Sequence, residues 1–250
     1  ISIMLRLITL TISLLSTVPL SGQQIKIVNE LESKKSTYEK IAFKIWEWAE
    51  LGYQEEKSSA LLKKTLSDAG FSIQNNVAKI PTAFIAEYGS GYPIIAILAE
   101  FDALPGLSQK AIPTRDPLIS GGSGHACGHH LFGTASVAAG IVIKSWMKND
   151  KINGTLRIYG TPAEEGGAGK VYMVRAGLFD DVDAVLHWHP SSKNNANPGS
   201  SLANKSAKFR FYGETSHAAV SPERGRSALD GVESMNQMVN MLREHVPQET

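Results

Sequence analysis

A run of apolar residues, 94–98, places the strongest constraint on the fold. Because successive side chains of a strand point to opposite faces, a strand that is apolar throughout is buried on both faces, as in a sheet covered by helices. The run leads directly into two acidic residues, Glu100 and Asp102. Open α/β sheets bind their ligands beyond the carboxyl ends of their strands. The sequence therefore predicts an α/β fold with a site at this edge.

Helical and strand patterns alternate along the chain. Apolar residues that recur at three- and four-residue steps predict helices, and shorter apolar stretches predict strands. The predicted helices span residues 24–52, 58–69, 131–146 and 169–176, and the predicted strands span residues 71–73, 83–88, 93–98, 155–159 and 184–187. This order is typical of a sheet flanked by helices.

The only cysteine, Cys127, stands two residues before His129 in a glycine-containing segment. A thiolate and an imidazole both bind divalent metal ions, and this spacing suits a turn that wraps one ion. A single cysteine cannot form an internal disulfide. We therefore interpret Cys127 as a metal ligand rather than as a buried apolar residue. His125 and His130, in the same segment, are interpreted as supporting or plain polar residues.

Two adjacent carboxylates, Glu164 and Glu165, lie in a glycine-rich turn directly after a predicted strand. Neighbouring side chains point in different directions, so one can bind a metal while the other takes a proton from a metal-bound water and returns it to a leaving amine. A solvated surface turn is the alternative, and the preceding apolar strand weighs against it.

His187 and His189 follow the next predicted strand. Pro190 restricts the backbone after His189, which favours His189 as a rigid ligand, but the choice between the two histidines stays open. Asp102 is expected to contact a ligand imidazole or the metal shell, with a turn or helix-capping role as the alternative.

A second, smaller domain is expected to open at residue 204, after a linker rich in Asn, Ser, Pro and Gly. It contains a predicted strand at residues 208–212 and a predicted helix at residues 227–245, whose apolar side chains should face inward. If this domain folds over the site, His217 can donate to a developing oxyanion and Arg226 can hold a substrate carboxylate. An exposed loop histidine and a solvated arginine at a helix end are the alternatives.

Residues 1–23 fit the pattern of an export signal. Arg6 supplies one positive charge, residues 7–20 are mostly apolar, and a polar exit follows. We therefore expect a periplasmic or secreted protein whose metal-binding domain spans residues 24–203. An uncleaved segment would leave the protein cytoplasmic or attached to a membrane. The net charge of +1 gives no field that attracts nucleic acid, so a small-molecule substrate is expected.

Six segments with candidate site residues follow one another in a fixed order. They are Ala99–Leu104, Gly124–His129, Gly160–Lys170, Trp188–Pro190, Ser216–Ala219 and Gly225–Asp230. Together they resemble the M20-type metallo-amidohydrolases, of the aminobenzoyl-glutamate utilisation protein B kind. The resemblance implies a catalytic domain with a mixed sheet flanked by helices, followed by the start of a smaller α+β lid or dimerisation domain.

The resemblance also implies the chemistry. Four residues would bind two divalent ions, manganese or zinc: Cys127, His129, Glu165 and His189. Glu164 would be the general base, His217 would act from the lid, and Arg226 would bind substrate. The implied reaction is hydrolysis of an N-acyl amino acid, most specifically p-aminobenzoyl-glutamate to p-aminobenzoate and glutamate, by a homodimer or heterodimer.

Three departures from the family pattern keep alternatives open. His130 stands where the family often has Asn or Asp, and His187 adds a second histidine next to His189. Members of the family are also much longer, so the resemblance predicts a fragment or a truncated product. A dipeptidase or other N-acyl-amino-acid hydrolase, and a metal-binding protein without turnover, are the competing hypotheses.

Overall fold

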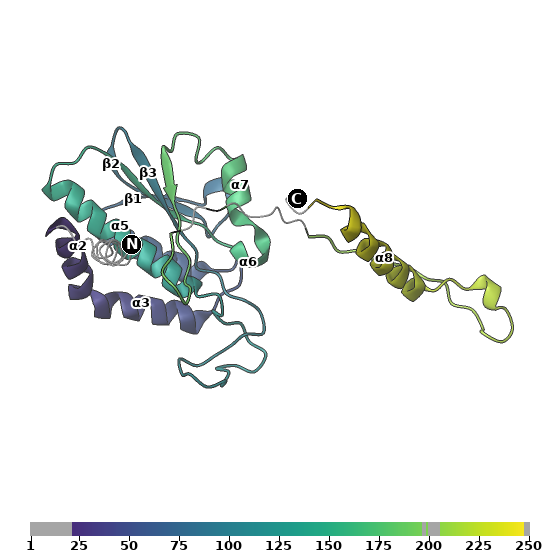
Figure 1. The fold of residues 1–250 in the computed structure, drawn as a ribbon. Coiled ribbons are helices and arrows are strands. Elements are labelled where there is room, and N and C mark those ends of the chain that lie inside the picture. The colour runs from purple at the N-terminus through teal and green to yellow at the C-terminus, as the bar shows by residue number, and fades with distance from the viewer. Residues whose placement is uncertain (1–21, 197–198, 200–205, 248–250) are drawn as a thin grey trace, which may run out of the picture. The chain divides into compact units, whose positions relative to one another are not determined.

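The computed structural model describes residues 22–196, 199 and 206–247 (Figure 1). The chain divides into two compact units, residues 1–192 and residues 193–250. Most of the predicted export signal and most of the predicted linker lie outside the described residues. Within the described part of the chain, no helix is both long enough and apolar enough to cross a membrane.

A five-stranded mixed sheet forms the centre of the first unit (Figure 1). Its strands are β1 (Ser72–Asn75), β2 (Phe84–Ser90), β3 (Ile94–Ala99), β4 (Gly154–Gly160) and β5 (Ala184–Leu186). They lie in the order β1-β2-β4-β3-β5. The β1–β2 and β2–β4 pairs are antiparallel, whereas β4, β3 and β5 run parallel to one another. The predicted α/β class and mixed sheet are confirmed.

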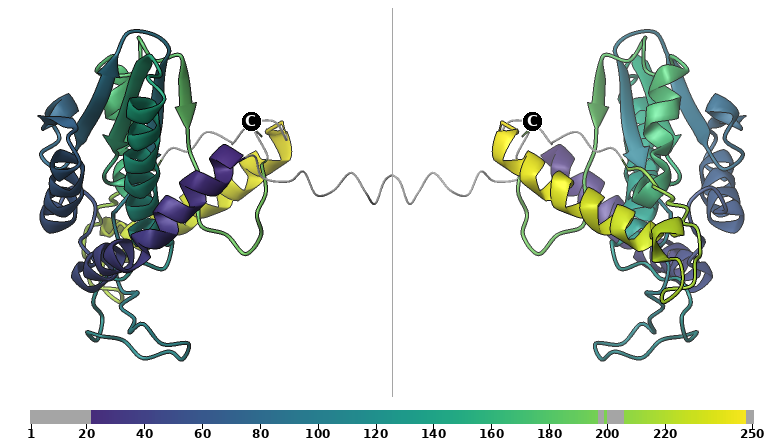
Figure 2. Two further views of the ribbon diagram at one scale, coloured as in Figure 1. Left: turned by 90° about the vertical axis from the view of Figure 1, so that its left-hand side faces the viewer. Right: turned by 90° about the vertical axis from the view of Figure 1, so that its right-hand side faces the viewer.

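Helices cover both faces of this sheet (Figure 2). They are α2 (Gly22–Ser33), α3 (Lys35–Trp48), α4 (Glu56–Asp68), α5 (His129–Asn149), α6 (Glu164–Gly167) and α7 (Gly169–Arg175), with a 3-10 turn η1 (Val77–Lys79). α4 and α5 pack directly on the strands, and α3 packs against both of these helices. α7 lies on the other face, next to η1.

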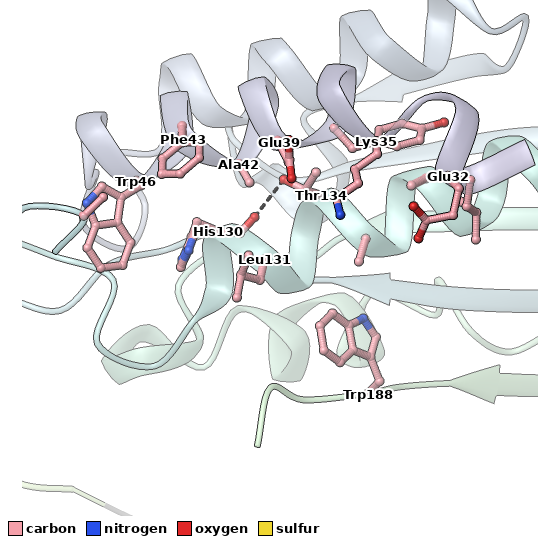
Figure 3. Close-up of a pocket in the computed structure, with 15 residues that line it drawn as sticks. Glu32, Lys35, Glu39, Ala42, Phe43, Trp46, His130, Leu131, Thr134 and Trp188 are labelled. Atoms are coloured by element: carbon pink, nitrogen blue, oxygen red, sulfur yellow. Dashed lines mark hydrogen bonds between the residues drawn. The ribbon is translucent and has the colours of Figure 1, made fainter. Parts of the chain in front are cut away.

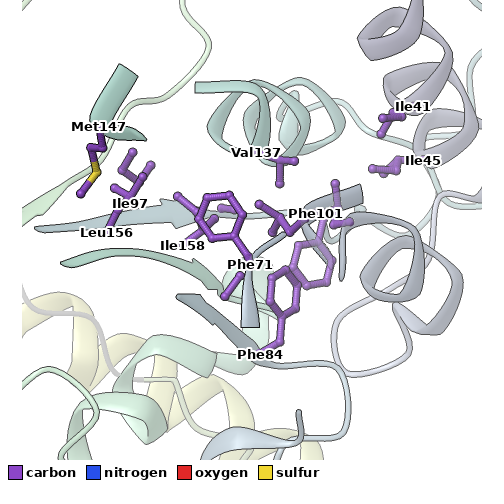
Figure 4. Close-up of a cluster of buried hydrophobic side chains, with 14 residues drawn as sticks. Ile41, Ile45, Phe71, Phe84, Ile97, Phe101, Val137, Met147, Leu156 and Ile158 are labelled. Atoms are coloured by element: carbon purple, nitrogen blue, oxygen red, sulfur yellow. The ribbon is translucent and has the colours of Figure 1, made fainter. Parts of the chain in front are cut away.

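Alternate strand residues enter two apolar clusters, one on each face of the sheet. Phe84 and Ile97 belong to the cluster beneath α4 and α5 (Figure 4). Their neighbours Ile85 and Leu98 belong to the opposite cluster, together with Met173 of α7. Full burial of one such side chain stabilises the fold by about 1.5–3 kcal/mol. The apolar run of residues 94–98 is thus covered from both sides, as its sequence predicts.

The helix predicted over residues 24–52 is two helices in the structure. The break lies at Lys34, which has φ −107° and ψ 6°. Ser33 contributes to this break, because its hydroxyl donates to the carbonyl of Glu30 at 2.7 Å and so competes with the helical pattern. α3 ends at Trp48, because Ala49 adopts a left-handed conformation. The connection from α3 to α4 therefore begins at Ala49.

The second unit contains one α-helix among its described residues. This helix, α8 (Ala228–Leu242), lies between the 3-10 turns η2 (Pro222–Arg224) and η3 (Arg243–His245). Ser227 caps it, because the serine Oγ accepts a hydrogen bond from the backbone N–H of Asp230 at 3.1 Å. The helix predicted at residues 227–245 is therefore present, with its last residues in a 3-10 turn.

Two expectations for the second unit are wrong. Residues 208–212 form no strand, because no strand among the described residues of this unit accepts their backbone hydrogen bonds. The apolar residues of α8 do not face a core: Leu229 and Met238 are each 62% exposed. Periodicity identifies an apolar stripe, but the described residues of this unit supply too little surface to cover it.

Candidate metal centre

The parallel strands bring three loops to one edge of the sheet. Glu100 and Asp102 follow β3, Glu164 lies just beyond β4 at the start of α6, and His187 follows β5. The first residue of α5, His129, points to the same place. Polar side chains from four distant segments thus meet where open α/β sheets bind ligands.

His129 lies at the centre of this group and is fully buried. Its Nδ1 lies 2.9 Å from Asp102 Oδ1, and because a carboxylate only accepts, Nδ1 carries the hydrogen. Nε2 therefore faces the carboxylates, 3.0 Å from Glu100 Oε2 and 3.9 Å from Glu165 Oε1. A histidine held by a carboxylate in this way presents its free nitrogen to a metal ion.

Asp102 also holds the turn that carries the paired glutamates. Its second oxygen, Oδ2, accepts a hydrogen bond from the backbone N–H of Glu165 at 2.9 Å. Asp102 thus contacts the imidazole of His129, one of the two roles considered from the sequence. It fixes the imidazole and the turn relative to each other.

Cys127 and His189 lie beside His129. Cys127 Sγ is 3.3 Å from His189 Nε2, and the ligand atoms of these three residues all lie within 4.8 Å of one another. Nδ1 of His189 is 2.9 Å from the carbonyl oxygen of Pro190, a contact that leaves Nε2 for the centre. His187 lies outside this group, with its Nε2 3.4 Å from Glu100 Oε1.

Glu100 belongs to the same centre, although the sequence pattern gives it no specific role. It is buried and forms an ion pair with Lys170 through Oε1. Burial alone would raise its pKa, but hydrogen bonds and charges from His129 and Lys170 outweigh burial and lower the pKa to about 2. Glu100, His129 and Glu164 form a second group whose ligand atoms lie within 4.8 Å of one another.

Three buried atoms in the centre have no hydrogen-bond partner: Glu100 Oε2, His129 Nε2 and Glu165 Oε1. The first two are 3.0 Å apart and form a hydrogen bond only when the imidazole carries a second proton, on Nε2; a neutral imidazole with its hydrogen on Nδ1 leaves both atoms unpaired. Buried polar atoms are rarely left unpaired. A divalent cation satisfies all three, and sulfur, imidazole and carboxylate are its usual ligands, so these residues fit a metal ion.

The acidic surroundings also act on Cys127. Burial, followed by the carboxylates of Glu165, Glu164 and Glu100, raises the pKa of the thiol to about 12. A neighbouring divalent cation has the opposite effect, because it stabilises the thiolate. The charge distribution at this edge therefore favours a bound cation.

Glu164 and Glu165 differ in exposure, as expected for adjacent residues. The side chain of Glu164 is 45% exposed and that of Glu165 is 19% exposed. Glu164 Oε2 lies 4.0 Å from His129 Nε2, so both carboxylates approach the same imidazole. Burial, then the charge of Glu100, raises the pKa of Glu164.

His125 and His130 point away from the centre. His125 Nε2 lies 3.0 Å from the carbonyl oxygen of Ile45 in α3, and the His130 ring packs edge-on against Trp46. Burial lowers their pKa values to about 4 and about 3, respectively. His130 also lines a cavity of about 650 Å³ between α3 and α5, together with Trp188 (Figure 3). None of the four predicted metal ligands lines this cavity.

The other two predicted site residues belong to the second unit. His217 is exposed, and its Nδ1 accepts a hydrogen bond from the backbone N–H of Ala219 at 3.2 Å. Arg226 is exposed and forms an ion pair with Glu214. Their roles as oxyanion donor and substrate anchor stay predictions.

Comparison with known proteins gives consistent matches. Residues 96–243 match the model of peptidase family M20/M25/M40. The chain is 47% identical over 221 residues to one of the subunits of the p-aminobenzoyl-glutamate hydrolase of Escherichia coli (strain K12), a match that covers 88% of this chain and 46% of that protein. It is 31% identical over 215 residues to the Xaa-Arg dipeptidase of Mus musculus, a match that covers 81% and 46%. The chain thus spans less than half the length of these two relatives.

One solved structure supports the fold. The aminobenzoyl-glutamate utilization protein from Klebsiella pneumoniae superposes with a TM-score of 0.51 at 16% sequence identity. The match covers 66% of this chain and 46% of the other. At this identity the likeness concerns the arrangement of strands and helices alone.

The contacts of Asp102 generate a testable prediction. In Asp102→Asn, one side-chain oxygen remains as an acceptor, so the side chain can no longer accept from both His129 and the Glu165 backbone. We expect the affinity for Co²⁺ to fall about 10–100-fold, the usual effect of losing such a support. Isothermal titration of the metal-free protein measures this.

Asp116→Asn is the matched control, because Asp116 pairs with Lys110 on an exposed loop. It should leave Co²⁺ affinity unchanged. Equal affinity of Asp102→Asn and the unchanged protein would show that Asp102 does not support the centre.

Proposed function

We propose that this chain, which belongs to peptidase family M20/M25/M40, carries the metal-binding part of a hydrolase that cleaves the amide bond of N-acyl amino acids. One observation carries the proposal: a cysteine and two histidines converge beside a pair of glutamates at the carboxyl edge of the sheet. The same edge holds buried carboxylate and imidazole atoms without partners.

In this proposal Cys127, His129, Glu165 and His189 hold two divalent ions, zinc or manganese. Cys127, His129 and His189 form one group of ligand atoms, Glu165 Oε1 lies 3.9 Å from His129 Nε2, and thiolate with imidazole and carboxylate suits these metals. Bound ions polarise the scissile carbonyl and lower the pKa of a bound water. The choice between the metals is open to direct metal analysis.

Glu164 acts as the general base and then as the acid. It is the more exposed of the two glutamates, so it can reach a substrate while Glu165 stays against His129. Its pKa is raised by burial and by Glu100, which brings the carboxyl closer to the pH at which it must both accept and release a proton. The proton is carried from the attacking water to the leaving amine.

The proposed substrate is p-aminobenzoyl-glutamate, because the 47% identical relative is named for this hydrolysis. A dipeptide is the second candidate, because the chain also resembles an Xaa-Arg dipeptidase over 81% of its length. Turnover of p-aminobenzoyl-glutamate compared with a panel of Xaa-Arg dipeptides distinguishes them. A metal-binding protein without turnover would hydrolyse neither.

The roles of the two glutamates should be distinguished by one variant at each position. Glu164→Gln should lower kcat about 10²–10⁴-fold while metal content stays unchanged, because only the proton carrier is lost. Glu165→Gln should lower the metal content itself, because a neutral amide oxygen is a much weaker ligand than a carboxylate. Turnover of p-aminobenzoyl-glutamate and elemental analysis of the same preparations measure both effects.

Glu56→Gln, at an exposed glutamate of α4, is the control and should change neither quantity. Full activity of Glu164→Gln would reject its assignment as the base. Full metal content of Glu165→Gln would reject its assignment as a ligand.

We also propose that the protein works together with another polypeptide. The Escherichia coli relative is named as one subunit of its hydrolase, which suggests a different chain as partner. Co-purification from the native host should yield a second polypeptide in a constant ratio. Recovery of only this polypeptide, in a dimer of identical chains, would favour the homodimer instead.

Export is proposed from the sequence alone. The charge of Arg6, the apolar residues 7–20 and the polar exit carry this proposal. N-terminal sequencing of the mature protein should begin near residue 24. A mature protein that retains residues 4–20 would contradict cleavage.

A further inference from the structure

The turn that carries Glu164 and Glu165 is held in an unfavourable backbone conformation at both ends. Ala163, directly before the pair, has φ 58° and ψ 42°, and Ala168, after the glycines, has φ 53° and ψ 44°. Residues with a Cβ atom disfavour this left-handed region. Such conformations persist where surrounding contacts impose them. Besides the bond from the Glu165 backbone to Asp102, contacts with this turn come from residues 50–55, which connect α3 to α4.

Glu55 makes the central contact. Its side chain is fully buried. Oε1 accepts a hydrogen bond from the backbone N–H of Ala163 at 2.8 Å, and Oε2 accepts one from Thr82 Oγ1 at 2.9 Å. A buried carboxylate is costly unless it is well hydrogen-bonded. Glu55 is satisfied by these two bonds, and one of them holds the residue that precedes the proposed base.

Two further residues of the same connection contact the turn. The Tyr53 hydroxyl donates to the carbonyl oxygen of Gly167 at 2.5 Å. Gly52 packs so closely that a Cβ atom there would lie 3.0 Å from both Cα and Cβ of Ala163. Residues 50–55 therefore contact the turn before and after the paired glutamates.

The same connection also contacts the loop that carries Asp102. Leu51 forms a parallel bridge with Ala103, and the backbone N–H of Ala103 donates to the carbonyl of Glu50 at 2.9 Å. The two loops that must be aligned, one with Asp102 and one with the glutamates, thus rest on one short segment.

We propose that residues 50–55 form a positioning strap, in which Glu55 and Tyr53 set the placement of Glu164 and Glu165 relative to Asp102. This inference rests on the proposed function. Neither Glu55 nor Tyr53 belongs to the groups of candidate metal ligands. They act through the backbone of the turn and are positioning residues.

The test compares two substitutions at Glu55. Glu55→Leu removes both acceptors at similar volume and leaves the Ala163 N–H buried without a partner. Glu55→Gln keeps one oxygen for Ala163, and its amide can donate to Thr82, whose hydroxyl also accepts. We expect Glu55→Leu to lower Co²⁺ affinity and kcat by about 10–100-fold with KM unchanged, and Glu55→Gln to restore both.

A second measurement needs neither metal nor turnover. Amide hydrogen exchange in residues 161–169 of the metal-free protein should be faster in Glu55→Leu and close to normal in Glu55→Gln. Ser59→Ala is the matched control, because Ser59 Oγ makes a buried hydrogen bond to the Thr82 carbonyl at 2.8 Å. It should leave exchange in the turn and Co²⁺ affinity unchanged.

Tyr53→Phe keeps the test valid if Glu55→Leu does not fold, because Tyr53 is 39% exposed and the change removes only the hydroxyl. It too should speed exchange in the turn. Unchanged exchange and Co²⁺ affinity in Glu55→Leu or Tyr53→Phe would overturn the strap. Faster exchange and lower Co²⁺ affinity in Glu55→Leu, both restored in Glu55→Gln, would support the strap. If the unchanged protein then hydrolysed no substrate, the proposed reaction would be rejected and the strap would stand.

Discussion

Asp102 connects separate segments of the chain through its two carboxylate oxygens. Oδ1 accepts from the His129 imidazole at the start of α5, and Oδ2 accepts from the Glu165 backbone after β4. The side chain is fully buried, so water does not compete for either bond. One group therefore links the loop after β3, the first turn of α5 and the glutamate turn. The direction of His129 Nε2, and with it the whole centre, depends on that group.

The fold keeps these acidic groups together at an electrostatic cost. Burial opposes the charge on His129, yet hydrogen bonds to Asp102 and Glu100 outweigh burial and raise the pKa of the imidazole to about 10. Burial and the nearby carboxylates raise the pKa of the Cys127 thiol to about 12. Without a cation, protons on the imidazole and the thiol reduce the excess negative charge. A divalent ion bound here would replace those protons, so binding of metal and release of protons would be coupled at this edge.

The sequence predicts the layers of the first unit well, because its signals are local. Alternation of side chains places Phe84 and Ile85 on opposite faces, and the run at residues 94–98 requires cover on both. The same alternation also predicts on which side of the chain the Glu100 side chain lies. Glu100 and Asp102 flank Phe101, which enters the core, so both acidic side chains must point the other way.

Other features could not be predicted, because they depend on contacts between distant segments. His187 and His189 stand two residues apart after β5, and the contact of Cys127 with His189 joins residues 62 positions apart, which no local pattern predicts. The alternating residues 208–212 form no strand, because pairing needs a partner that the pattern cannot supply. The contact of Glu55 with Ala163 joins residues 108 positions apart, and no local pattern predicts it.

Reaction type and substrate rest on different parts of the molecule. Two relatives named for different substrates, an aminobenzoyl-glutamate hydrolase subunit and an Xaa-Arg dipeptidase, each match more than four fifths of this chain. The segments that form the candidate centre are matched in both relatives, so the centre itself does not explain why their substrates differ. In the proposed function, the candidate ligands and residues 50–55 therefore concern the cleavage of the amide bond itself. Under the proposed function, selection would come from groups that contact the remainder of the substrate, and Arg226, whose guanidinium pairs with the Glu214 carboxylate, stays the predicted anchor for a substrate carboxylate.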